Sequence, residues 1–275
     1  MTSTRSTNYL VGLVRELCKL PRDRAGRFSS KVVAAHRRYD EATEKEHVET
    51  RGYAAGFKTM ITVINGFVPS NEVIGQAFRK TVPMYPEPAV RELVANALIH
   101  QDFFLTGTGP MVEIFADRVE VTNPGAPLID PQRFIDSPPT SRNEKLASFM
   151  RRVNICEERG TGIDKVVASV EIFQLPAPDF RVYEHHTKAV LFAPMKYGDM
   201  RRADRIRACY QHACLQWVSG GEMSNATLRK RFGIEERNYA TVSRVIAETL
   251  DAKLIRPADP DNKSKKHARY VPFWA

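Results

Sequence analysis

Residues 91–100, RELVANALIH, decide how the middle of this chain is interpreted. Glu92 and Asn96 are four positions apart, so they project from the same face of a helix. Leu93 and Ala97 lie on faces that can pack against a sheet. An amide and a carboxylate one turn apart suit a hydrated magnesium ion, because the amide oxygen is a hard ligand and the carboxylate can orient a water. The same spacing also occurs on exposed helices that bind nothing, so the interpretation needs further motifs.

A second motif, VEVTNPG at 119–125, follows along the chain. An alternating strand ends at Asn123, and the Pro-Gly turn after it lets the chain approach a ligand closely. Asn123 then faces a pocket at the strand end. The alternative is a tight turn in which the Asn merely caps the strand.

The third motif is ERGTGIDKVV at 158–167. Gly160, Thr161 and Gly162 open a helix, so free backbone N–H groups and the positive helix end can meet phosphate oxygens. A similar run, TGTGP at 106–110, leads into a strand and is interpreted as a turn.

The periodicity of the flanking segments predicts an α/β region over about 88–194. A Pro- and Ser-rich loop or lid is expected at 131–140. The predicted helices are Tyr9–Leu20, Tyr53–Ile64 (stopping at Gly66), Pro88–His100 and Asn143–Arg152, with another after Gly160. The predicted strands are Lys31–Ala35, Met111–Ala116, Arg118–Thr122, Phe180–Tyr183 and Ala189–Phe192.

Residues 201–275 predict a winged helix-turn-helix domain. A helix over Arg205–Val218 precedes a second one that Ser224 caps, and a turn containing glycine leads to a third helix over Glu236–Asp251. Two short strands around a basic loop form the wing. The residues expected to contact DNA are Arg237, Asn238, Thr241 and Arg244 on the third helix and Lys263, Lys265 and Lys266 in the wing.

The charge distribution supports a polyanionic partner for this module. Of the net charge of +9, residues 201–275 carry +7, from 15 Lys/Arg against 8 Asp/Glu. We therefore expect double-stranded DNA as the partner. The alternative is a winged helix that mediates protein contacts, for example in a homodimer.

Together the three motifs resemble the N, G1 and G2 boxes of the GHKL (Bergerat) ATPases. More closely, RELVANALIHQDF, VEVTNPG and ICEERGTGIDKV resemble bacterial ATP-binding proteins described as RecG-like helicases or transcriptional regulators. The resemblance covers roughly 45–275. It implies an α/β fold, an α+β sandwich of GHKL type, followed by a winged helix and usually preceded by a Schlafen/AlbA-like domain.

The resemblance also implies a role for each matching residue, with ATP and Mg²⁺ as cofactors. Glu92 would be the catalytic base, and Asn96 would coordinate Mg²⁺. Asn123 would contact the adenine edge, and Gly125 would leave room for the ring. Gly160, Thr161 and Gly162 would cradle the phosphates, while His100 and Asp102 would line the lid side of the pocket.

The chain departs from the family pattern in two places. GHKL enzymes use Asp where this chain has Asn123, and an amide oxygen accepts a hydrogen bond without bringing charge. The N-terminal segment is also short for a Schlafen/AlbA-like domain. The domains are therefore predicted as a truncated or replaced N-terminal segment at 1–85, an ATP-binding domain at 86–196 and a winged helix at 201–275.

The leading hypothesis is an ATP- and DNA-binding protein, a nucleotide-responsive transcriptional regulator. A slow Mg²⁺-dependent ATPase and a pseudo-ATPase scaffold remain open, whereas a P-loop helicase is excluded because the sequence lacks GxxxxGK(S/T). The four cysteines form no CxxC pair, and the polar N-terminus is no secretory signal. With no apolar run near ~20 residues, these features predict a reduced, cytoplasmic protein.

Overall fold

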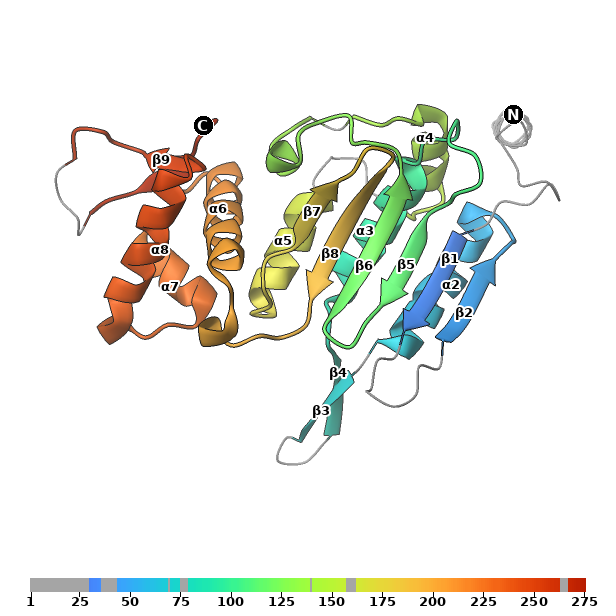
Figure 1. Cartoon of the computed structure of the whole chain (residues 1–275), viewed down its shortest axis with the longest axis horizontal. Coiled ribbons are helices and arrows are strands. Elements are labelled where there is room, and N and C mark those ends of the chain that lie inside the picture. Colours follow the sequence, from blue (N-terminus) through green and yellow to red (C-terminus); the bar gives the residue numbers. More distant parts are fainter. Residues whose placement is uncertain are drawn as a thin grey trace, which may run out of the picture.

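A six-stranded mixed sheet, with strand order β2-β1-β5-β6-β8-β7, is the centre of the fold (Figure 1). The computed structural model describes residues 30–35, 44–68, 70–74, 79–138, 140–156, 162–262 and 267–275. Strand β1 pairs with β5 in parallel, and the other neighbours are antiparallel. The strands are β1 (Ser30–Ala35), β2 (Glu44–Glu49), β5 (Met111–Ile114), β6 (Arg118–Pro124), β7 (Asp179–Val182) and β8 (His186–Phe192).

Helices cover one face of this sheet, and the main core lies between the two layers (Figure 1). Val119 and Val121 of β6 alternate toward that core, as the period of a strand requires, and meet Leu93 and Leu98. Pro88 stands in the first turn of its helix, where its missing N–H leaves no bond unmade. The helices are α2 (Tyr53–Phe67), α3 (Glu87–Ile99), α4 (Glu144–Arg152) and α5 (Gly162–Ile172).

An antiparallel hairpin of β3 (Ser70–Ile74) and β4 (Arg79–Pro83) connects α2 to α3. Figure 1 shows that it projects away from the sheet and its helices. The sequence analysis did not predict this hairpin.

The C-terminal region has its own core of three helices and a two-stranded sheet. Ser224 caps α7 as predicted, in a reciprocal capping box with Thr227. Gly233 ends the same helix with φ 63°, a conformation that favours glycine. The elements are η2 (Tyr197–Asp199), α6 (Arg202–Val218), α7 (Asn225–Phe232), η3 (Glu236–Asn238), α8 (Tyr239–Asp251), β9 (Ile255–Pro257) and β10 (Tyr270–Pro272).

Several predicted boundaries differ from the observed ones. The helix expected to stop at Gly66 continues to Phe67, because a glycine weakens a helix without ending it. The third C-terminal helix begins at Tyr239 rather than Glu236, since the residues before it form a 3-10 turn. In the sheet, β1 of the N-terminal segment pairs directly with β5. The helix predicted at 9–20 lies outside the described residues.

Helix α5 packs against both cores. Val166 and Val170 belong to the main core, whereas Val167 belongs to the C-terminal core. At the end of α5, Glu171 lies 3.0 Å from His212 Nδ1 and 3.3 Å from Arg231 Nε. The two halves of the protein are therefore joined by buried apolar and charged contacts.

No helix among the described residues is long and apolar enough to cross a lipid bilayer.

The Glu171 contacts predict a large stability effect. Glu171→Ala leaves the buried Arg231 guanidinium without its carboxylate, so the free energy of unfolding should fall by about 3–5 kcal/mol. Denaturant unfolding measures this. The matched control is Arg237→Ala, which breaks an exposed pair with Glu235 and should cost less than about 1 kcal/mol. Equal losses in the two variants would contradict the proposed importance of the buried pair.

Candidate functional site

Helix α3 presents Glu92 and Asn96 side by side, as their spacing predicts. The Asn96 side-chain N–H donates to Glu92 Oε1 at 3.1 Å. This bond uses the amide nitrogen, so the amide oxygen of Asn96 is the atom available to a cation. Most of the other side chains of the helix are buried, which fixes the direction in which its polar face points.

The first turn of α5 lies directly against Glu92. A Cβ atom added to Gly162 would stand 1.8 Å from Glu92 Oε1, a distance at which a neighbour must move. Glycine at this position therefore allows the carboxylate to approach the N-terminus of α5. Two of the three motifs are thus brought together, while Gly160 and Thr161 lie outside the described residues.

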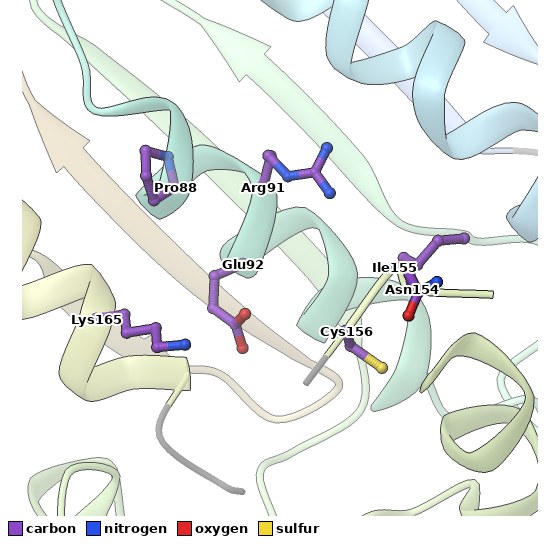
Figure 2. Close-up of a pocket in the computed structure, with 7 residues that line it drawn as sticks. All are labelled: Pro88, Arg91, Glu92, Asn154, Ile155, Cys156 and Lys165. Carbon is purple, nitrogen blue, oxygen red and sulfur yellow. The ribbon is translucent and has the colours of Figure 1, made fainter. Parts of the chain in front are cut away.

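A cavity of about 330 Å³ adjoins Glu92, within the lower range of small-molecule sites. Figure 2 shows the Lys165 and Glu92 side chains extending toward one another from α5 and α3. The other lining residues come from α3 and from the segment after α4. The lining residues are Pro88, Arg91, Glu92, Asn154, Ile155, Cys156 and Lys165.

The second motif meets the C-terminal end of α3. Asn123 lies on the same face of β6 as Val119 and Val121, toward the helices. Gly125 has φ 106°, and a Cβ there would lie 2.9 Å from the Cβ of Asp102. The backbone N–H of Asp102 donates to the Pro124 carbonyl at 2.8 Å. Asp102 thus fills the space beside Gly125. A larger residue at position 125 would collide with Asp102, so this contact explains why glycine is required there.

Arg142 is a residue of this region to which the sequence analysis gave no role. Its guanidinium donates to Asp102 Oδ2 at 3.1 Å and to the Ala126 carbonyl at 2.6 Å. The other carboxylate oxygen of Asp102 accepts from the Phe104 N–H. Asp102, predicted to line the pocket, thereby also holds the segment after α3 to the turn after β6.

Asn143 was also missed. Its side-chain N–H groups donate to the carbonyls of Ile99 and Gln101, both at 2.7 Å, and so satisfy the C-terminal end of α3. Asn143 stands just before a helix and after a Pro- and Ser-rich stretch. This position was the signal in the sequence that could have indicated its role. The partners, more than 40 positions away, could not be named from the sequence.

His100 ends α3 and is predicted to line the nucleotide pocket. Burial, followed by the nearby Arg142 charge, lowers the pKa of His100 below its ordinary value. The imidazole is therefore neutral at neutral pH and can serve as a hydrogen-bond partner rather than as a cation.

The segment predicted as a lid contacts the C-terminal region. It contains the short helix η1 (Pro131–Arg133). Tyr210 donates to the Gln132 carbonyl, and the Arg133 guanidinium lies 5.0 Å from the centre of the Trp274 ring. Ile135 is buried in the C-terminal core. This segment thus connects the region around the candidate site to α6 and to the C-terminal end of the chain.

Four of the predicted DNA-contacting residues occupy two elements, η3 and α8. Arg237 and Asn238 are exposed in η3, and Arg237 pairs with Glu235 at 2.7 Å. Thr241 and Arg244 lie on α8, where Arg244 is exposed. The wing residues Lys263, Lys265 and Lys266 lie outside the described residues.

The comparisons with known proteins support a nucleotide-binding interpretation of the middle region. Residues 107–191 match the family described as "Putative ATP-dependent DNA helicase recG C-terminal". This region resembles an ATPase-like domain. The match spans β5 to β8 and includes the second and third motifs, whereas α3 precedes it. It suggests that the chain binds ATP.

A solved structure shares the fold at low sequence identity. The DIP2311 protein of Corynebacterium diphtheriae is 15% identical, with a TM-score of 0.57 over 90% of this chain and 51% of that one. The present chain therefore spans about half the length of that protein. No curated protein matches the sequence.

Asp164 in the first turn of α5 makes stability depend on pH. Burial, with a smaller contribution from Asp136, raises the pKa of Asp164 from 3.8 to about 6, and its Oδ1 atom has no hydrogen-bond partner. The folded state thus binds the proton more tightly than the unfolded one. Stability contributed by this carboxyl is present at about pH 4 and is lost as the pH rises through about 6.

Asp164→Asn should therefore raise the melting temperature at about pH 7.5 more than at about pH 4, since the amide stays neutral throughout. Thermal unfolding of both proteins at the two pH values measures this. A difference that is the same at both would show that Asp164 does not titrate in this way.

Proposed function

We propose that this chain is an ATP-binding, DNA-binding protein that acts as a nucleotide-responsive transcriptional regulator. The observation that carries the proposal is that Glu92, which lines a cavity, meets both Asn96 and the N-terminus of α5. A carboxylate, an amide oxygen and a helix N-terminus are the groups that a hydrated Mg²⁺–phosphate complex needs.

The nucleotide would lie along α3. Asn123 and His100 stand near the C-terminal end of this helix and would hold the adenine end. From His100 back to Glu92, eight residues of helix rise about 12 Å, which places the phosphate groups toward Glu92. Asn96 lies between them and would ligate Mg²⁺. Gly160–Gly162 would contribute backbone N–H groups to the phosphates.

We assign this site to an ATP-binding domain at 86–196, with residues 201–275 as a winged helix. In this arrangement β1 and β2 of the N-terminal segment, 1–85, extend the sheet of the ATP-binding domain. We interpret that segment as a truncated or replaced Schlafen/AlbA-like region. The helix-turn-helix would be formed by α7 and α8, and β9 and β10 would flank the basic wing.

The charge and exposure of the C-terminal region support DNA as its partner. The +7 net charge of 201–275 contrasts with +2 over the other 200 residues. On α8, Val242, Val245 and Ile246 are buried, whereas Arg244 is exposed. Such a helix can expose a polar face to the major groove while its apolar face holds the core.

Two connections between the site and the C-terminal region support a nucleotide response. Helix α5 begins against Glu92 and ends in the buried Glu171 contacts. The 131–138 segment packs on Tyr210 and Trp274. A shift of α5 or of this segment on ATP binding would therefore reposition α6 and the helices packed on it.

A second candidate function, slow Mg²⁺-dependent hydrolysis of ATP, is favoured by the position of Glu92 on the cavity wall. A carboxylate in that place can accept a proton from a water that attacks the terminal phosphate. A scaffold whose C-terminal region binds protein, including a second copy of the chain, is the outcome if neither ATP nor DNA binds.

ATP binding should depend on Asn96 and Gly162. Asn96→Ala removes the proposed metal ligand, and Gly162→Ala forces Glu92 away from the first turn of α5. Both should weaken ATP binding roughly 10-fold or more, as expected for loss of a charge-assisted contact. Calorimetric titration with ATP, ADP and GTP, with and without Mg²⁺, measures this.

The matched control is Gly198→Ala, because a Cβ at Gly198 meets nothing within 4 Å. It should bind ATP like the parent. If Asn96→Ala and Gly162→Ala fold and bind ATP as tightly as the control, the site assignment is wrong.

DNA binding should be electrostatic and should reside in the C-terminal region. Phosphate contacts release counterions, so affinity for duplex DNA should fall steeply with salt. Lys265→Ala and Lys266→Ala should each reduce the slope of log K against log salt by about 1, on all sequences alike. Arg244→Ala should instead affect preferred sequences more than random ones. Binding by the full chain that is absent at low salt, or insensitive to salt, would refute a DNA-directed function.

A further inference from the structure

The cavity beside Glu92 is lined by two cationic side chains. The roles proposed above for Glu92, Asn96 and Gly162 do not explain why these cations are there. Its lining includes Lys165 and Arg91 beside Glu92, and a further amide from Asn154. Figure 2 shows that Lys165 and Glu92 reach into this space from two different helices. The sequence analysis assigned no function to either cation.

We propose that this cavity holds the terminal phosphate of a nucleoside triphosphate, with Lys165 as its principal ligand and Arg91 as a second cation. The inference rests on the proposed ATP site and goes further, because it makes the chain selective for triphosphates over diphosphates. A diphosphate placed along α3 in the same way would end before the cavity and would not contact Lys165.

The position of Lys165 supports this role. It follows Gly162 by three residues, in the first turn of an 11-residue helix. Its ammonium group and the positive end of α5 therefore act on the same region of space. An anion in the cavity would interact with both the ammonium group and the helix end. A lysine can bind phosphate as a point charge in more than one geometry.

Arg91 is held in place by aromatic packing. Its guanidinium carbon lies 5.3 Å from the centre of the Phe57 ring, and Phe57 is buried in the main core. A cation–π contact of this kind restricts the side chain before a ligand arrives. Arg91 thus contributes a positioned positive charge to the wall of the cavity.

The size of the cavity also fits. A water occupies about 30 Å³ of the liquid, so a space of about 330 Å³ accommodates a phosphate group together with several waters. A water beside Glu92 would then stand next to the terminal phosphate, where the proposed hydrolysis needs it.

Calorimetry on the full chain with Mg²⁺, using ADP and the non-hydrolysable β,γ-imido analogue of ATP, tests the proposal. Lys165→Met should weaken binding of the triphosphate analogue about 10- to 100-fold, the range expected for one charge-assisted contact. Its affinity for ADP should change less than about 3-fold, within the spread of mutations that remove no direct contact. Lys165→Arg should restore most of the triphosphate affinity.

The matched control is Lys58→Met, since Lys58 is exposed on α2 and does not line the cavity. Unfolding curves establish that each variant is folded, and Lys165→Gln replaces the methionine variant if that one is not. Equal loss of ADP and triphosphate affinity, or no loss of either, would overturn the inference. A parent protein that binds neither nucleotide would instead refute the proposed ATP site itself.

Discussion

The contact between Glu92 and the bare Cα of Gly162 is the constraint on which the rest of the candidate site depends. A Cβ at that position would lie 1.8 Å from Glu92 Oε1, so the Glu92 side chain would have to move from the place where α3 and α5 meet. Their close approach brings a carboxylate, an amide and a helix N-terminus to one place. It also forms one wall of the cavity that Lys165 lines. The missing Cβ of Gly162 thus allows the Glu92 carboxylate to take its position beside the proposed phosphate site.

Helix α5 joins the two halves of the protein, since its residues pack in both cores. Val166 packs under the sheet, while Val167 packs in the C-terminal core. Its last turn supplies Glu171 to His212 and Arg231. These attachments are the physical basis of the proposed nucleotide response, because both cores pack on the same helix.

Local signals in the sequence predicted local structure well. The cap at Ser224, the strand that carries the second motif and the helix carrying Glu92 are all present, although the strand continues past Asn123 to Pro124. Each depends on residues within about one or two turns of one another, whose chemistry is visible in the sequence. The sequence analysis did not predict the β3–β4 hairpin or the 3-10 turn before α8. In these segments the local preferences are weak and the hydrophobic pattern has no clear period, so tertiary contacts decide the structure.

The sequence by itself determined the candidate chemical groups and the elements that carry them: a polar pair on one helix face, a glycine-opened helix and a basic C-terminal region. Only the tertiary structure decided which of these groups meet. Arg142 reaches Asp102 across 40 positions, and Gly162 receives Glu92 from another helix. Contacts of this kind arise from the packing of helices on a sheet, which depends on the shape of the whole core and leaves no periodic trace in the chain.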